Sequence, residues 1–168
     1  VVVGVVLTLP ISSAALCMML GLSGLAAGAA TVGCCCQMVG FAVMSFKENG
    51  WGGLFAQGIG TSMLQMGNIV KNPKIWIPPT LASAILGPLA TMFFKIENSP
   101  IGAGMGSCGF VGQIATVSTM EEIGKGGTSL YIAIILLHFI LPAVVTLIIA
   151  GFMRKKGCIK DGDLKLNL

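Results

Sequence analysis

Charged residues are scarce in this sequence: aspartate, glutamate, lysine and arginine make up only 10% of its 168 residues, against 55% for hydrophobic types. A soluble globular domain carries about 25% charged residues, so this chain has too little polar surface to face water on all sides. Its apolar runs are long and do not alternate with polar residues at every second position, which excludes a transmembrane β-barrel. The composition predicts an all-α fold, a polytopic transmembrane helical bundle.

Motifs typical of several other function classes are also missing. The basic residues flank apolar segments instead of forming a patch, so nucleic acid is not an expected partner. No C-x-x-C pair accompanies the run Cys34–Cys36, and adjacent cysteines on a helix point in different directions, so we expect no metal. No G-K-[ST] follows the glycine-rich stretch, which excludes a nucleotide loop. We therefore expect no catalytic residue and no cofactor, and we interpret the buried-looking cysteines as packing residues in a reduced environment.

Four segments are long and apolar enough to be predicted as membrane spans. They cover residues 1–20, 22–46, 75–94 and 129–150, the first interrupted at Pro10 and the third kinked by its prolines. The first begins without the basic region of a signal peptide, so we expect the numbering to start within a longer protein. The predicted organisation is a transmembrane domain over 1–150 and a short basic cytoplasmic tail over 151–168.

Basic residues predict the orientation of these spans. If the tail is cytoplasmic, eight of the ten basic residues lie on that side, and only Lys95 and Lys125 lie on the other. The cytoplasmic set is Lys47, Lys71, Lys74, Arg154, Lys155, Lys156, Lys160 and Lys165. This assignment requires segments 51–70 and 99–122 each to enter and leave from one side.

Segment 51–70 has a polar face on an otherwise apolar helix. Gln57, Thr61, Gln65 and Asn68 follow one another at steps of four, four and three residues, which places them on one side of a helix. Such a face can lie at the membrane interface or can line a hydrated cavity inside the bundle, and the pattern supports both interpretations equally.

The stretch "SPIGAGMGSCGFVG", residues 99–112, contains five glycines between two hydrophobic segments. Non-helical backbone at membrane depth is tolerated only where protein encloses it or water fills a cavity beside it. We therefore predict that segment 99–122 is a re-entrant hairpin, in which Gly102, Gly104 and Gly106 turn with positive φ and bring backbone groups to a ligand. The alternative is that these glycines only pack helices tightly.

The predicted substrate-binding residues combine this segment with other polar positions inside apolar sequence. The carboxylate, amide and backbone groups of this set are of the kind that binds a polyhydroxylated ligand such as a sugar. Glu121 and Glu122 can equally well be surface residues, and His138, in the middle of a span, can equally well be structural. The full set is Asn98, Gly102, Gly104, Gly106, Ser107, Gln113, Glu121, Glu122, Gln57, Gln65, Asn68 and His138.

Three stretches resemble a known membrane family: "LTLPISSAALCMMLGLSGLAAGAATVGCCCQMVGFAVMSF", "GTSMLQMGNIVKNPKIWIPPTLASAILGP" and "ENSPIGAGMGSCGFVGQ". The family is the enzyme IIC-like domain of the bacterial sugar phosphotransferase system, including the branch labelled as a regulator of the toxin perfringolysin. The chain resembles the C-terminal half of such a domain, up to about residue 150. The resemblance implies a multi-pass protein of the bacterial cytoplasmic membrane with a cytoplasmic C-terminus.

The same resemblance implies a homodimer that binds a sugar-like solute at its midplane and exposes it alternately by an elevator or rocking motion. In sugar permeases a glutamate after a hairpin contacts the sugar, and T-M-E-E at 119–122 is a loose match to that motif. Because only a short tail follows residue 150, any phosphorylation would come from separate phosphotransferase carrier proteins. The chain would be at most the permease component of such a system.

Two functions follow from these observations, and a third is weaker. The leading hypothesis is solute binding and transport, because of the glycine-rich segment and the polar residues beside it. The second is a membrane sensor or regulator that keeps the fold without transport. A thiol or metal sensor using the run Cys34–Cys36 is the weakest of the three.

Overall fold

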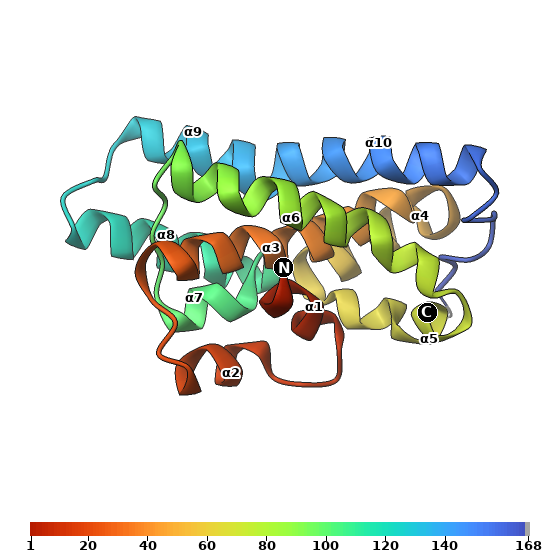
Figure 1. Ribbon diagram of the computed structural model, residues 1–168, viewed down its shortest axis with the longest axis horizontal. Helices are drawn as coiled ribbons and strands as arrows, with labels where there is room; N and C mark the ends of the chain where they lie inside the picture. Colours follow the sequence, from red (N-terminus) through yellow and green to blue (C-terminus); the bar gives the residue numbers. More distant parts are fainter. Residues whose placement is uncertain (167–168) are drawn as a thin grey trace.

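The computed structural model describes residues 1–166 as a bundle of helices, and these residues form no strand (Figure 1). This confirms the all-α prediction. The α-helices are α1 (Val2–Thr8), α2 (Ser13–Met19), α3 (Gly24–Met44), α4 (Phe46–Phe55), α5 (Met66–Lys71), α6 (Ile77–Met92), α7 (Pro100–Met105), α8 (Val111–Glu122), α9 (Thr128–Ile135) and α10 (Leu141–Lys155). Two π-helical segments, η1 (Ala56–Gly60) and η5 (Leu136–Ile140), and three 3₁₀ segments, η2 (Ser62–Gln65), η3 (Pro73–Trp76) and η4 (Cys108–Phe110), interrupt or join them.

Three continuous helical stretches in residues 1–166 are long and apolar enough to cross a bilayer: Gly24–Met44, Pro73–Met92 and Thr128–Lys155. They confirm the spans predicted over 22–46, 75–94 and 129–150. The third continues five residues beyond its predicted end, because α10 runs on to Lys155. Pro78 and Pro79 are tolerated at the start of α6, since the first amides of a helix have no intrahelical partner.

The predicted span over residues 1–20 is wrong. The segment divides into α1 and α2, each of seven residues and so only about 10 Å long, far less than the bilayer requires. Two features cause the break. Pro10 cannot continue the helix from Thr8, and Ser12 starts a new one by accepting a hydrogen bond from the Ala15 amide at 3.2 Å.

Helix α3 is the centre of the bundle. It packs against α1, α6, α7 and α10, and it lies between the other helices in Figure 1. Val32 and Cys36 of α3 share an apolar core with Leu86 of α6 and Leu137 of η5. All six cysteines are free, and the run Cys34–Cys36 is completely buried, in agreement with a packing role.

Two broken helical hairpins fill the remaining faces of α3. Hairpin A, residues 46–71, leaves the C-terminal end of α3 and returns to η3, beside the same end. Hairpin B, residues 99–122, starts where Asn98 pairs with Gly24 at the N-terminal end of α3, and it returns beside α9. The hairpins therefore enter the bundle from opposite ends.

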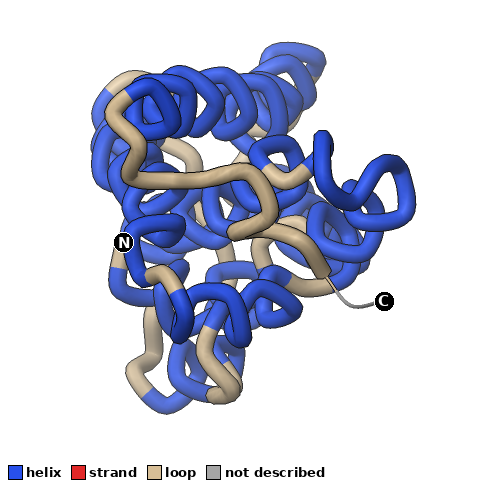
Figure 2. Tube along the Cα trace, turned by 90° about the vertical axis from the view of Figure 1, so that its right-hand side faces the viewer, coloured by secondary structure: helices blue, strands red, loops and turns tan. Residues whose placement is uncertain are grey.

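Basic residues are divided unequally between these ends. Lys47 lies in the first turn of α4, Lys71 ends α5 and Lys74 lies in η3, all at the end from which hairpin A enters. Helix α10 ends at the same place with Arg154 and Lys155. Figure 2 looks onto this end, where the loop that follows α10 crosses in front of the helices toward the C-terminus.

Candidate solute-binding site

The turn of hairpin B lies against the middle of α3. Gly106 has φ +55°, and a Cβ atom built on it would stand 2.6 Å from Cys34 Cβ and 2.9 Å from the Cys34 carbonyl carbon. Gly104 approaches the start of α2 equally closely, where the Ser13 hydroxyl donates to the Gly104 carbonyl at 2.6 Å. Glycine is required at both positions because any side chain would collide with a neighbouring helix.

The positive φ predicted for three glycines of this hairpin is correct only at Gly106. Gly102 and Gly104 are helical and lie inside α7, because the chain turns later than predicted, at Gly106 and Gly109. Their carbonyls accept from Thr31 at 3.3 Å and from Ser13. These backbone groups thus fasten the hairpin to α3 and α2.

The tips of the two hairpins meet in the interior. The Ser107 hydroxyl of hairpin B donates to the Gly58 carbonyl of hairpin A at 2.6 Å. Gly58 lies in the π-helical segment η1, whose wider turn leaves carbonyls outside the regular α-helical pattern, and such segments are frequent at functional sites. Ser62, further along hairpin A, shares a 2.9 Å hydrogen bond with Thr8 of α1.

A buried polar pair lies one turn beyond the tip of hairpin B. Gln113 Nε2 donates to His138 Nδ1 at 3.1 Å, and the same amide lies 3.4 Å from Cys35 Sγ. Because Nδ1 accepts, the ring proton of the neutral imidazole is on Nε2. Both His138 Nε2 and Gln113 Oε1 are buried without a hydrogen-bond partner. An unpaired donor and an unpaired acceptor thus lie on two adjacent side chains, within the second π-helical segment, η5, and the start of α8.

An apolar groove of about 210 Å³ opens beside the hairpin tips. Gly58 and Phe110, from the two tips, line it together with Phe139 of η5, and the two aromatic rings are 6.2 Å apart between centroids. Binding pockets for small solutes combine apolar and aromatic walls with a few placed polar groups. The groove supplies the apolar and aromatic walls, and its lining residue Phe139 directly follows His138 in the chain.

Asn98 holds the base of hairpin B. Its Nδ2 lies within hydrogen-bonding distance of Thr31 Oγ1 at 2.7 Å, Thr116 Oγ1 at 2.9 Å and the Gly112 carbonyl at 3.1 Å. Its Oδ1 accepts from the Ser99 amide at 2.8 Å. The side chain, only 1% exposed, is therefore occupied by contacts within the protein.

The substitution Asn98→Ala is expected to lower the free energy of unfolding by about 1–3 kcal/mol, because it removes a buried donor that joins three segments. Thermal unfolding in detergent micelles measures this change. The control is Thr91→Ala, which removes a hydroxyl bonded only to Pro88 of its own helix. A smaller loss for Asn98→Ala than for Thr91→Ala would contradict the role of Asn98 in fastening the hairpin.

Gln57, Gln65 and Asn68 form a polar face in the structure, but the single helix predicted over 51–70 is broken at Thr61, whose backbone is extended, with φ −157° and ψ 139°. The predicted exposure of this face to a hydrated cavity is not found. Gln57 and Gln65 are completely buried; Gln57 Nε2 donates to Ser45 Oγ at 2.8 Å, and Gln65 Nε2 donates to Gln57 Oε1 at 2.9 Å. Asn68 Nδ2 continues the series by donating to Gln65 Oε1 at 2.8 Å. The face is covered by the segment that follows α10, whose carbonyls accept from Gln65 and Asn68.

The remaining predicted residues lie apart. Glu121 and Glu122 are exposed at the last turn of α8, about 12 Å along the helix from Gln113. Thus Gly106, Ser107, Gln113 and His138 come together near Gly58, whereas the two glutamates belong to the end of the bundle.

Three residues that were not predicted to bind solute complete this region. Thr31 and Cys35, both on α3, bond to hairpin B, and Gly58 accepts from Ser107. The usable signal for Thr31 and Cys35 was their spacing of four residues on one face of a predicted span. Nothing in the sequence distinguishes Gly58 from its neighbours.

Comparison with known proteins identifies the family. A family model described as "Phosphotransferase system, EIIC" matches residues 1–166. No curated protein and no solved structure matches the chain. The chain therefore belongs to the EIIC family of the phosphotransferase system and is a permease-type membrane domain.

Proposed function

We propose that this chain binds a hydroxyl-rich, sugar-like solute between its two hairpins and carries it across the membrane. The observation that supports this most directly is the unpaired donor and acceptor of the buried pair His138 and Gln113. A buried polar group without a partner is costly, so its presence in a native protein calls for an explanation. A sugar carries several hydroxyls, each of which can donate and accept, and so one sugar offers partners for both free atoms.

The arrangement of the hairpins supports alternating access to this site. They enter from opposite ends of α3, and we propose that both are re-entrant, so that their tips meet near the bilayer midplane. His138 has no exposed surface, and therefore a solute reaches it only after the tips separate. The contact between Ser107 and Gly58 is the direct link that must break. In this proposal Asn98 and the glycines of hairpin B position the tip, and they do not themselves bind solute.

The distribution of basic residues supports an orientation of the bundle in the membrane, and this orientation indicates where a carrier protein would meet the solute. The end that carries most of the lysines is assigned to the cytoplasm of a bacterium, with the opposite end, near Lys95 and Lys125, outside. A separate phosphotransferase carrier protein would meet the solute at the cytoplasmic end. Association as a homodimer is part of the same proposal, on the ground of the family resemblance.

Counterflow in proteoliposomes tests the proposal without an energy source. The full chain is reconstituted, and exchange of radiolabelled hexoses, N-acetylhexosamines and hexitols is measured against empty liposomes, with equilibrium binding to the same compounds. Saturable exchange of at least one compound is expected. Binding without exchange would contradict transport and would favour the sensor. The absence of both binding and exchange for every compound would contradict the solute site itself.

A further inference from the structure

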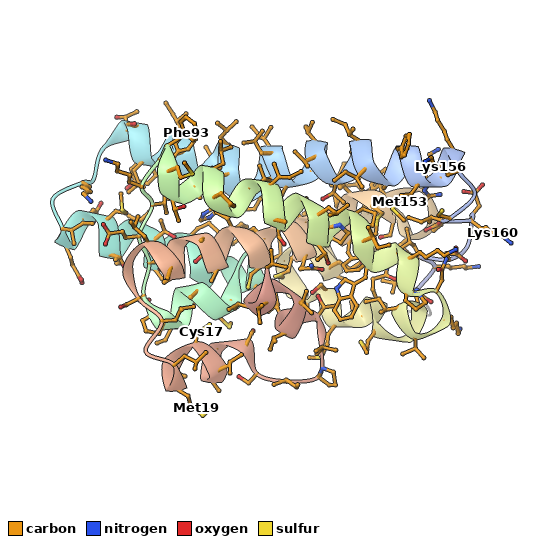
Figure 3. The ribbon with its side chains drawn as sticks, viewed as in Figure 1. Cys17, Met19, Phe93, Met153, Lys156 and Lys160 are labelled. Atoms are coloured by element: carbon orange, nitrogen blue, oxygen red, sulfur yellow. The ribbon has the colours of Figure 1, made fainter. Side chains whose placement is uncertain are left out.

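The segment that follows α10, residues 157–166, lies across hairpin A; we call it the tail segment. Leu164 is completely buried and Ile159 is 2% exposed, and both belong to an apolar cluster with Ile69 of hairpin A and Phe41 of α3. In Figure 3 this part of the chain closes the end of the bundle, while Lys156 and Lys160 extend away from it. The tail segment is therefore packed against the bundle as part of its core.

The first arm of hairpin A is bonded to the backbone of the tail segment. Asn49 Nδ2 donates to the Leu164 carbonyl at 2.8 Å, and Asn49 Oδ1 accepts from the Leu166 amide at 2.7 Å. One asparagine thus satisfies both a carbonyl and an amide of the tail segment. Glu48 Oε1 accepts from the Gly162 amide at 3.1 Å.

The returning arm of hairpin A is bonded to the same stretch. Gln65 Nε2 donates to the Leu164 carbonyl at 3.0 Å, and Asn68 Nδ2 donates to the Lys165 carbonyl at 2.9 Å. Just after this arm, Asn72 Nδ2 donates to Asp163 Oδ2 at 2.7 Å. The Leu164 carbonyl therefore joins both arms, through Asn49 and Gln65.

Arg154 ties this assembly to the long helices. It lies in the last turn of α10 and donates to the Met44 carbonyl of α3 at 3.1 Å, to Glu48 Oε1 at 3.3 Å and to Asp161 Oδ1 at 2.8 Å. Glu48 is only 9% exposed as a side chain, so its pairing with Arg154 is shielded from solvent, whereas Asp161 is 96% exposed. The tail segment is thus connected at once to α3, α10 and both arms of hairpin A.

We propose that the tail segment is a clasp that holds hairpin A against α3 and α10, and that hairpin A changes position only after the tail segment detaches. The polar face of hairpin A is then a receptor for a peptide backbone. Its amides contact carbonyls and an amide of the tail segment, and Leu164 anchors the segment in the apolar cluster. This inference goes beyond solute binding, because the residues that bond the tail segment, Asn49, Gln65 and Asn68, are not those of the tip contact or of the Gln113–His138 pair.

Hydrogen–deuterium exchange on the full chain in lipid nanodiscs tests the clasp. The double variant Asn49→Ala with Leu164→Ala removes two hydrogen bonds and the anchor. Its exchange is expected to rise at least tenfold in residues 46–71 and 157–166 and to stay unchanged in α6. The matched control is Lys165→Ala, which removes an exposed side chain and keeps the carbonyl that Asn68 binds.

A milder variant keeps the test decisive if the double variant unfolds. Asn68→Ala loses only its bonds to Gln65 and to the Lys165 carbonyl, so a smaller rise confined to the same two regions is expected. Faster exchange in the tail segment alone, with hairpin A unaffected, would overturn the proposal. An equal rise throughout the bundle would overturn it as well. Neither measurement depends on a solute.

Discussion

The double substitution Gln113→Leu with His138→Leu is expected to weaken solute binding and counterflow strongly while leaving the melting temperature unchanged or higher. It removes the free acceptor and the free donor together, and each neutral hydrogen bond to a ligand contributes about 0.5–1.5 kcal/mol. Losing both removes about 1–3 kcal/mol, which corresponds to roughly a 5- to 150-fold loss of affinity. Stability is expected not to fall, because replacing two buried polar partners by apolar groups of similar size is nearly neutral or stabilising.

The opposite directions of the two readouts separate solute binding from a structural role. If the pair were structural, its loss would lower the melting temperature and change affinity only in step with unfolding. The matched control is Gln37→Leu, since Gln37 is as completely buried as His138 but has Trp76 and Thr80 as partners, at 3.1 and 3.0 Å. It is expected to lower the melting temperature and to leave affinity unchanged. His138→Gln, which can keep a donor, is expected to retain more binding than His138→Leu.

Gly106→Val is expected to destabilise the fold more than the substitution of any other glycine in the turn of hairpin B. Its φ of +55° strains a β-branched residue, and the new Cβ would meet Cys34 Cβ at 2.6 Å, with α3 backbone behind it. Backbone strain and overpacking each cost about 1–3 kcal/mol, and together they would lower the melting temperature by roughly 5–20 °C. Thermal unfolding of the purified variant in detergent micelles measures the loss.

Gly109→Val isolates the packing contribution. Gly109 has nearly the same φ, +52°, but a Cβ atom at this position would have Val111 Cγ2, at 3.9 Å, as its nearest neighbour, so only the backbone strain is expected. The difference between the two variants therefore measures the close approach of the tip to α3. Equal losses for Gly106→Val and Gly109→Val would contradict that approach.

Long apolar segments were predictable from the sequence alone, but short broken ones were not. Helix α3 and the helices that begin at Pro73 and Thr128 were located within a few residues, because about 20 consecutive apolar residues have few alternatives to crossing a bilayer. Residues 1–20 have similar composition, yet Pro10 and the Ser12 cap divide them into two short helices. Composition over a window does not register such a break, because it averages over the residues that cause it.

The candidate site was predicted in part. Gly106, Ser107, Gln113 and His138 were singled out because they are glycine or polar residues in apolar surroundings, and the structure brings them to one region. The polar face of 51–70 was recognised, but its partner was not, because the tail segment that covers it is about 100 residues further along the chain. Periodicity within a segment carries no information about which distant segment packs on it.

The order of residues was enough to establish that this protein is a helical membrane domain, where its three long apolar helices lie and where its basic residues gather. These properties depend on composition and on neighbours within a few turns of helix. The packed structure was needed to establish that two hairpins meet at Ser107 and Gly58, that Gln113 and His138 keep free polar atoms, and that the tail segment lies bonded across hairpin A. The physical reason is that hydrogen bonds and close backbone contacts between distant residues depend on the whole packing arrangement, and no local pattern encodes it.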